Sequence, residues 1–305
     1  MPELPEVEAA RRGIAEQLAG RTVTGFELYR PRLVQSLPGL SLDLLPGRRL
    51  LEVGRRGKYL WLVFEPLAAV LHLKLTGQLV ARGDAIPGFA AGHPVPPYDA
   101  PLPHKSTALR LDFQPGIQLY LTDVRHFARV WLLPVDDLPD YVDRLGLGPD
   151  LLSPDFTFEA FRRRLERRRS GRLKPTLLDQ SVIAGIGNIY ADESLWQARL
   201  HPEQVVGELS ADDLARLYEG IRETIRLAVP VGGARILHGK AVPPAGEFPF
   251  VHGREGQPCP RCGTTIVKFQ VNGRGTYLCP RCQPAPPGVT ARLAPSVQQP
   301  APIAE

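Results

Sequence analysis

The first residues of the chain have the chemistry of a nucleophilic site. Met1 precedes Pro2, and removal of a methionine from this position leaves a free secondary amine at the N-terminus. An α-amino group titrates at about 7.7 to 8.0, so a useful fraction is neutral at pH 7, whereas an ordinary lysine is almost wholly protonated. Glu3 and Glu6 follow within one helical turn and place two carboxylates beside the amine. The alternative is an ordinary N-terminus, whose prolines and acids suit a first helical turn.

The four cysteines of the chain predict a metal site. They form two Cys-x-x-Cys units, Cys259 with Cys262 and Cys279 with Cys282. Four thiolates at this spacing bind one Zn²⁺ in a closed tetrahedral site, which leaves no coordination position open for chemistry. We therefore expect one structural zinc ion in a reducing compartment, in place of disulfide bonds.

The segment between the cysteine pairs predicts a β-hairpin. Residues 266–271 and 276–278 read as strands joined around Asn272-Gly273, the favoured signal for a tight two-residue turn. Arg274 follows the turn directly, where a bound zinc ion would hold it rigidly. This arginine is either a solvated charge or a contact to a ligand.

The apolar pattern changes between the two halves of the chain. After a first helix over residues 4–18, short apolar strands alternate with Gly and Pro turns to about residue 135, which predicts a β-sandwich or barrel. Residues 58–64 are nearly continuously apolar, as expected for a strand buried on both faces. Lys58 lies at the start of this stretch. It is either a charged residue that flanks a hydrophobic strand or a member of the site formed by the N-terminal residues. From about residue 150 to 229 the spacing becomes helical.

Two loops carry residues suited to nucleic acid. Residues 123–127 form the tip between two predicted strands, where an exposed arginine and phenylalanine could enter a duplex; the alternative is a core phenylalanine beside a surface arginine. Residues 184–193 join a glycine turn to Asn188, a good helix N-cap. Exposed amides at such a helix N-terminus predict a phosphate site. The basic run over residues 162–174 is either a solvated helix face or a further contact.

Five strings together resemble the bacterial formamidopyrimidine-DNA glycosylases over residues 2 to about 282. The strings are PELPEVE (2–8), RRGKYL (55–60), DVRHF (123–127), GIGNIYADES (185–194) and the four-cysteine finger. The resemblance implies a bifunctional DNA glycosylase and abasic-site lyase that excises oxidised purines, namely 8-oxoguanine and formamidopyrimidines. It also implies a Schiff base on Pro2, followed by β- and δ-elimination.

The resemblance assigns roles to individual residues of this chain. Pro2 is the implied nucleophile, Glu3 protonates the sugar ring oxygen, and Glu6 supports them. Lys58 and Arg274 are implied to assist at the phosphates and in the elimination steps. The implied DNA contacts are Glu6, Leu75, His104, Arg125, Phe127, Arg169, Lys174 and Asn188.

The chain departs from the family pattern at three places. Leu75 stands where the family commonly carries a methionine, and we expect it to fill the place of the flipped base. After Gly233 the chain has Ala234 and Arg235 in place of small hydroxyl residues, so no base-reading residue is assigned in this loop. The stretch 82–103 is longer than the corresponding loop of the family, and no function is assigned to it.

The expected fold class is α+β with several domains. It consists of an N-terminal β-sandwich with an N-terminal helix, a central helical domain with a helix-two-turn-helix motif, and a C-terminal zinc-finger β-hairpin. We place the domain limits at 2–135, 150–240 and 250–282. Residues 283–305 are rich in proline and lack periodicity, which predicts a disordered tail.

The composition of the chain limits which binding partners and which cellular compartment are expected. The chain has 305 residues and a formal net charge of +5, which fits a negatively charged partner such as damaged double-stranded DNA. No apolar run approaches the roughly 20 residues of a membrane span, so we expect a cytoplasmic protein. The resemblance implies a bacterial enzyme, and we expect it to act as a monomer. Three alternatives stay open: an endonuclease VIII-like glycosylase for oxidised pyrimidines, a non-catalytic zinc-ribbon nucleic-acid binder, and a tautomerase with an N-terminal proline base.

Overall fold

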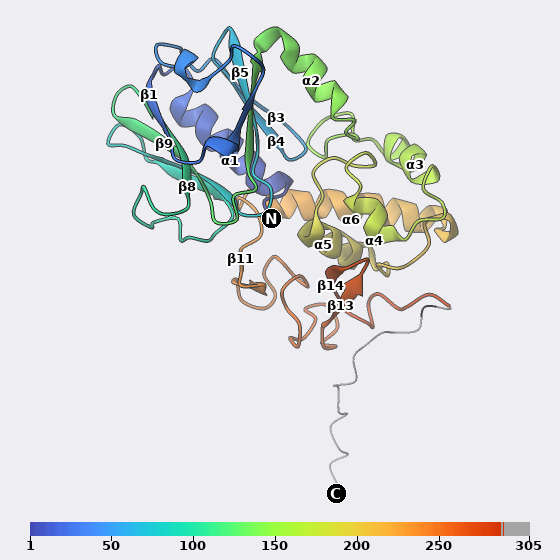
Figure 1. The fold of residues 1–305 in the computed structure, drawn as a ribbon. Coiled ribbons are helices and arrows are strands. Elements are labelled where there is room, and N and C mark those ends of the chain that lie inside the picture. Colours follow the sequence, from blue (N-terminus) through green and yellow to red (C-terminus); the bar gives the residue numbers. More distant parts are fainter. Residues whose placement is uncertain (288, 290–305) are drawn as a thin grey trace, which may run out of the picture.

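The N-terminal half of the chain folds into two five-stranded sheets that face each other (Figure 1). The computed structural model describes residues 1–287 and 289. One sheet has the order β1-β8-β9-β6-β7 and the other β2-β10-β5-β4-β3, and all neighbours are antiparallel except β2 and β10. The strands are β1 (Val23–Leu28), β2 (Val34–Ser36), β3 (Glu52–Arg56), β4 (Tyr59–Val63), β5 (Leu67–His72), β6 (Gly77–Arg82), β7 (Phe89–Gly92), β8 (Thr107–Phe113), β9 (Ile117–Asp123) and β10 (Arg129–Pro134). The predicted β-sandwich is confirmed.

Helix α1 (Leu4–Leu18) packs against β3, β4 and β7. The apolar residues that recur at helical spacing are all buried, namely Leu4, Val7, Ala10, Ile14 and Leu18. Gly20 follows the helix with φ +82°, a left-handed conformation that glycine adopts without strain. The predicted helix and its glycine stop are therefore found. Because α1 begins at Leu4, Pro2 and Glu3 lie immediately before its first turn.

Strand β4 is covered on both faces, as the sequence predicted. Leu60 and Leu62 point into the core between the sheets. Tyr59 and Trp61 pack on the outer face against Leu138, which begins α2 (Leu138–Arg144). Lys58 precedes the strand and is buried.

The second half of the chain is helical around its own apolar core. Its helices are α3 (Phe158–Glu166), α4 (Leu173–Leu178), α5 (Asn188–Ala198) and α6 (Ala211–Ala228), with the short 3₁₀ helix η4 (Val206–Glu208). The other short 3₁₀ helices belong to the N-terminal half, namely η1 (Pro31–Leu33), η2 (Leu42–Leu44) and η3 (Val135–Asp137). Phe161, Leu195 and Ile221 from three of these helices meet in the core. In the described part of the chain, no helix is long and apolar enough to cross a membrane.

The C-terminal hairpin packs on the outside of α5. Strands β13 (Val267–Val271) and β14 (Arg274–Leu278) pair antiparallel, and Asn272 and Gly273 both have positive φ, as the predicted tight turn requires. The connection from α6 to the finger contains only the short strands β11 (Ile236–Leu237) and β12 (Lys240–Ala241). In Figure 1 the N-terminus lies where the sandwich, the helices and this connection meet.

The finger extends one residue beyond its last cysteine. Gln283, which the sequence assigned to the disordered tail, is buried. Its side-chain carbonyl accepts the Cys279 amide at 3.1 Å, and its amide group donates to the Leu200 carbonyl at 2.9 Å. That assignment was wrong for Gln283, because sequence composition does not reveal these two bonds. Most of the predicted tail lies outside the described residues.

A buried ion pair joins the sandwich to the helical half. The Arg55 guanidinium donates to both Asp150 oxygens at 2.7 and 2.9 Å, and to Glu8 Oε2 at 3.1 Å. Burial alone would raise the pKa of Glu8, but hydrogen bonds from Arg11, Arg12 and Arg55 lower it to about 2. Because the folded pKa is depressed from 4.5, this contribution to stability is present above pH 4.5 and is lost as the pH falls towards 2.

Removal of Arg55 should therefore destabilise the whole fold. Arg55→Ala leaves the Glu8 and Asp150 carboxylates buried without their common partner, and we expect a loss of about 3–5 kcal/mol in the free energy of unfolding by urea. Arg12→Ala is the matched control, because Arg12 binds the same Glu8 but is 47% exposed, and should cost less than about 1 kcal/mol. Equal losses for the two variants would contradict a special role of the buried pair.

Candidate active site

Residues far apart in the sequence line one cavity of about 370 Å³ at the N-terminus. Pro2, Glu3 and Glu6 form one side of it. The other walls come from the β5–β6 turn, the segment after β7, the start of α5, the loop after α6 and the finger; their lining residues are Leu75, Gly92, His93, Pro94, Val95, Asn188, Ile189, Ala234, Ile236, His238, Gly239, His252 and Arg274. The volume falls in the usual range for a small-molecule or single-base site.

The Glu3 carboxylate occupies the N-terminus of α5. Its Oε2 accepts the Gly187 amide at 2.7 Å and the Tyr190 amide at 3.4 Å, and its Oε1 accepts the Ile189 amide at 3.1 Å. A Cβ atom at Gly187 would lie 2.4 Å from the Glu3 carboxyl carbon, so only glycine fits there. The predicted phosphate site at this helix end was therefore wrong, because the amides already bind a carboxylate of the chain itself.

Asn188 is the first residue of α5, and the N-cap position belongs to Gly187. The predicted N-cap role of Asn188 was therefore wrong. Its side chain instead lines the cavity and donates from Nδ2 to the Gly275 carbonyl at 2.8 Å. Its Oδ1 is buried and has no partner among the described residues.

Glu6 connects the N-terminus to the loop after α6. Its Oε2 accepts the Glu3 amide at 2.8 Å, and its Oε1 accepts the Tyr190 hydroxyl at 2.5 Å and the Ala234 amide at 2.9 Å. Burial, together with the nearby charge of Glu3, raises the pKa of Glu6 to about 7. Glu6 can therefore take up or release a proton at neutral pH.

Of the two predicted basic groups of the site, one lines the cavity and the other is buried near its carboxylates. Arg274 lines the cavity from the first residue of β14. Lys58 is buried, and the charges of Glu3, Glu6 and Arg274 act on it. Burial lowers the pKa of Lys58, and the two carboxylates oppose that shift. All four residues predicted to be catalytic are thus brought together.

The predicted wedge residues sit on two adjoining turns. Phe127 is 43% exposed and the Arg125 guanidinium lies 5.0 Å from the centre of its ring, so Phe127 is not a core residue. Asp123, which the sequence analysis did not single out, accepts the Arg125 amide at 3.1 Å and the Ala128 amide at 2.6 Å. It also accepts the hydroxyl of Thr76, the residue that follows Leu75. Asp123 therefore ties both turns together.

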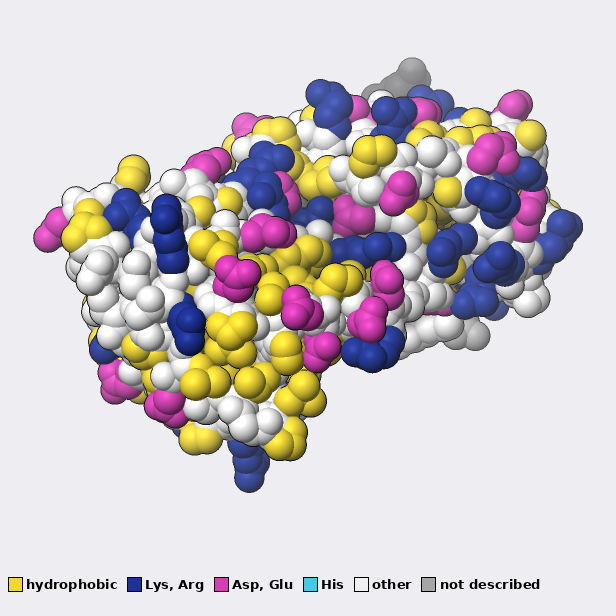
Figure 2. All heavy atoms as spheres, turned by 90° about the horizontal axis from the view of Figure 1, so that it is seen from above, with side chains coloured by type: hydrophobic (Ala, Val, Ile, Leu, Met, Phe, Trp, Pro, Cys, Tyr) yellow, Lys and Arg dark blue, Asp and Glu magenta, His cyan; other side chains and the backbone are white. Residues whose placement is uncertain are grey.

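The remaining predicted DNA contacts lie outside the cavity. His104 is half-buried and its Nδ1 accepts the Ser106 amide at 3.1 Å. Arg169 is exposed in the basic run, and Figure 2 shows Lys and Arg side chains gathered over the end of the molecule where α3 and α6 lie. Part of this run is neutralised, since Arg162 and Arg168 form ion pairs with acids of the same surface.

Lys174 is placed differently from the prediction. Its side chain has no exposed surface, and its ammonium group forms an ion pair with Asp192 and donates to the Gly275 carbonyl and the Thr276 hydroxyl. A direct contact with a phosphate is contradicted in this structure, because these partners already take its donors. The sequence could not reveal this, since the partners lie 18 and about 100 residues further along the chain.

Sequence reasoning also missed the wall after β7. It lies in the stretch 82–103, to which no function was assigned. The Gln78 side chain donates to the carbonyls of His93 and Pro96 at 2.9 Å each, which fixes this segment beside the cavity. Strand β7 in this stretch consists of Phe89, two alanines and Gly92, and alanine and glycine are uncommon in strands.

The four cysteines fit a zinc ion. Their sulfur atoms lie within 4.8 Å of one another, with pairs at 3.4, 3.5 and 3.9 Å. Tetrahedral Zn–S bonds of about 2.3 Å place sulfur atoms roughly 3.8 Å apart, which matches this cluster. The Trp196 indole of α5 donates to Cys259 Sγ at 3.4 Å, so the cluster is tied to the helical half.

Comparison with known proteins agrees with this geometry over nearly the whole chain. Residues 1–130 match the formamidopyrimidine-DNA glycosylase N-terminal domain, residues 147–238 its H2TH domain, and residues 256–285 the zinc finger found in FPG and IleRS. The chain is 41% identical over 292 residues to the formamidopyrimidine-DNA glycosylase of Pelotomaculum thermopropionicum, covering 93% of this chain and 99% of that protein.

Solved structures of a homologue from Lactococcus lactis are also similar. The fold resembles that of the Lactococcus lactis FPG bound to a FAPY-dG-containing DNA, with a TM-score of 0.79, 33% identity, and 93% and 100% of the two chains covered. The complex of the same protein with DNA containing an abasic site gives a TM-score of 0.78 at the same identity and coverage. Since the family match extends over all three parts of the chain, this protein belongs to the formamidopyrimidine-DNA glycosylase family.

Proposed function

We infer that this chain is a bifunctional DNA glycosylase and abasic-site lyase that removes oxidised purines, namely 8-oxoguanine and formamidopyrimidines, from double-stranded DNA. The observation that carries this conclusion is the position of Pro2 at one cavity with Glu3, Glu6 and Arg274. A nucleotide can reach this cavity only after it has left the base stack.

The reaction follows from the chemistry of a secondary amine. The Pro2 nitrogen, freed by removal of Met1, attacks C1′ of the sugar and loses its proton, and the damaged base leaves with the electron pair of its glycosidic bond and takes up a proton. The C1′–O4′ bond then breaks, the ring oxygen keeps that electron pair and is protonated, and the nitrogen lone pair forms the C=N bond of an iminium. The resulting iminium has no N–H to lose, so it stays cationic and acts as an electron sink. Loss of a C2′ proton breaks the C3′–O bond, and loss of a C4′ proton then breaks the C5′–O bond. Each phosphate leaves with its electron pair, and water finally releases the amine.

We assign the proton transfers to the two carboxyl groups. Glu3 lies next to Pro2 and is held by three amides of α5, so it can deliver a proton to the sugar ring oxygen from a fixed position. Glu6 supports it as the carboxyl group with a pKa of about 7. Lys58 and Arg274 act on the phosphates and in the elimination steps.

DNA binding is assigned to groups around the cavity. Leu75, Arg125 and Phe127 fill the gap left by the flipped nucleotide, and His104, Arg169 and Asn188 contact the backbone. Lys174 supports DNA binding indirectly by holding the hairpin of the finger, because its ammonium group donates to the Gly275 carbonyl. We also propose that the enzyme acts as a monomer in the bacterial cytoplasm, where its DNA substrate lies, and that its domains span residues 2–135, 150–240 and 250–282.

The zinc ion should be needed for DNA binding more than for the main fold. Cys262→Ser removes one ligand, so we expect loss of zinc and of duplex affinity, while the main thermal transition survives because the two larger cores do not include the finger. Zinc content, binding to a lesion duplex and calorimetry test this. A zinc-free protein that binds the duplex normally would contradict it.

Phe127 should matter for opening the duplex rather than for chemistry. Phe127→Ala should slow excision of 8-oxoguanine from a duplex on the order of 10-fold, with a smaller effect on cleavage at a preformed abasic site, where less unstacking is needed. Val124→Ala is the matched control, since Val124 is an equally exposed apolar residue of the same loop. Equal losses on both substrates would contradict a role of Phe127 in opening the duplex.

Variants of Pro2 and Glu3 separate the nucleophile from the acid. Pro2→Gly gives a primary amine whose imine must be protonated to stay cationic, so both activities should fall while lesion binding persists. Glu3→Gln keeps the amine but removes the proton donor, so base excision should drop on the order of 10² to 10⁴-fold, with partial cleavage retained at an abasic site. Glu16→Gln, an exposed carboxyl group on the same helix, is the control.

Borohydride trapping on a duplex with a single 8-oxoguanine identifies the nucleophile directly. The adduct should map to the N-terminal peptide, and a blocked N-terminus should abolish trapping. If a blocked enzyme still traps, the nucleophile is an internal lysine, with Lys58 as the first suspect, and the proposed mechanism is wrong.

A further inference from the structure

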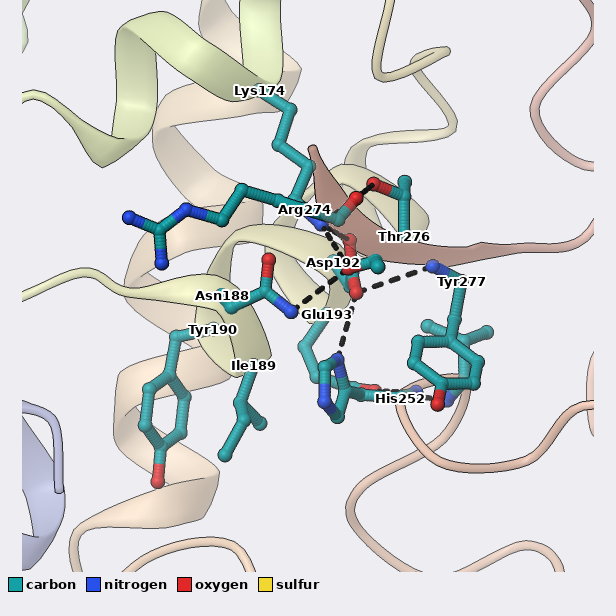
Figure 3. A network of polar contacts seen from close by, with 12 residues as sticks. Lys174, Asn188, Ile189, Tyr190, Asp192, Glu193, His252, Arg274, Thr276 and Tyr277 are labelled. Carbon is teal, nitrogen blue, oxygen red and sulfur yellow. Dashed lines mark hydrogen bonds and ion pairs between the residues drawn. The ribbon is translucent and has the colours of Figure 1, made fainter. Parts of the chain in front are cut away.

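Two consecutive acids in the middle of α5 are completely buried and point to the finger (Figure 3). Glu193 accepts the backbone amides of Phe250, Val251 and His252, each at 2.8 Å. Asp192 binds the Lys174 ammonium at 2.7 Å, the His252 Nδ1 at 2.7 Å and the Tyr277 amide at 3.2 Å. Glu193 therefore fixes the segment before the finger, whereas Asp192 acts on the hairpin itself.

The partners of Asp192 converge on the residue next to Arg274. The Lys174 ammonium donates to the Gly275 carbonyl at 3.0 Å and to the Thr276 hydroxyl at 2.9 Å. Asn188 donates to the same Gly275 carbonyl. Figure 3 shows Lys174 and Asn188 reaching the strand on which Arg274 lies. The backbone that carries Arg274 is thus fixed by two side-chain donors, and Asp192 holds one of them in place.

The finger also contacts α5 through apolar side chains outside this network. Trp196, Val251, Ile266 and Tyr277 already form an apolar cluster between α5 and the finger. The Arg261 guanidinium also lies 3.9 Å from the centre of the Trp196 ring. A buried ion pair adds little to stability beyond what an apolar pair of the same size would give. Its location at the turn end of the hairpin therefore favours a role in geometry.

We propose that Asp192 is a positioning residue of the lyase reaction, which acts through Lys174 and the Gly275 carbonyl to hold Arg274 at the cavity. The proposal rests on the proposed function, in which Arg274 assists the elimination steps. Burial lowers the pKa of Lys174, and the charge of Asp192 opposes that shift. Helix α5 therefore fixes Glu3 through the amides of its first turn and fixes Arg274 through Asp192, which lies four residues after the start of the helix.

Product analysis on a duplex with one preformed abasic site tests this proposal in the zinc-loaded, full-length enzyme. The first elimination leaves a 3′ unsaturated aldehyde and the second a 3′ phosphate, and a sequencing gel resolves them. Asp192→Asn should slow the second elimination on the order of 10-fold, in the same direction as Arg274→Ala, because small displacements of a catalytic group have large effects on rate. Borohydride trapping by Pro2 and zinc content should change less than about twofold.

Two comparisons distinguish positioning from stability. The double variant Asp192→Asn with Lys174→Met removes both buried charges, so its melting temperature should recover while the second elimination stays slow. Glu8→Gln also disrupts a buried ion pair, but far from the finger, and should lower the melting temperature without changing the product ratio. In an Arg274→Ala background, Asp192→Asn should have no further effect on the second elimination.

The outcomes separate the proposal from the function on which it rests. If Arg274→Ala slows the second elimination but Asp192→Asn and the double variant do not, the network is only structural and the proposal is overturned. If Arg274→Ala leaves that step unchanged, the proposal fails together with the role of Arg274. If the wild-type enzyme neither traps nor cleaves, the proposed function itself is wrong.

Discussion

The site depends on one contact, in which the carboxylate of Glu3 binds the amides that begin α5. A helix N-terminus carries orphan N–H groups and a partial positive charge, and it must find an acceptor. Here the acceptor comes from the other end of the molecule, more than 180 residues away in the sequence. Because Glu3 is fixed in this way, the preceding residue, Pro2, is held at the cavity. The contact also explains why residue 187 must be glycine.

Helix α5 then acts as the common frame for the other parts of the site. Its first turn binds Glu3, Tyr190 reaches Glu6, and Asn188 and Asp192 reach the hairpin. Groups from the sandwich, from the connection after α6 and from the finger are thereby all held in place by contacts with this one helix. A zinc cluster suits this arrangement, since it makes a small hairpin rigid without a large core of its own. The helix is buried on nearly all sides because it serves all of these contacts.

Local patterns predicted the elements, but not the contacts between them. The 3.6-residue period of α1, the Asn-Gly turn and the cysteine spacing each reflect physics within a few residues, and all three were found as expected. The phosphate site at α5 and the phosphate contact of Lys174 were wrong for one shared reason. A sequence shows that a helix end or a lysine needs a partner, but it does not show that a distant segment already supplies it. The wall at His93 was missed because its position depends on the pairing of β7 with β6.

The two carboxyl groups beside Pro2 have different environments. Glu3 is bound by amides, whereas Glu6 is buried against it and has its pKa raised to about 7. Neighbouring carboxyl groups in different environments can divide the tasks of acid and base. Glu6 also accepts the Ala234 amide, so the loop after α6 is attached to the same group. Ala234 also lines the cavity, so this hydrogen bond ties one wall of the cavity to the carboxyl group beside Pro2.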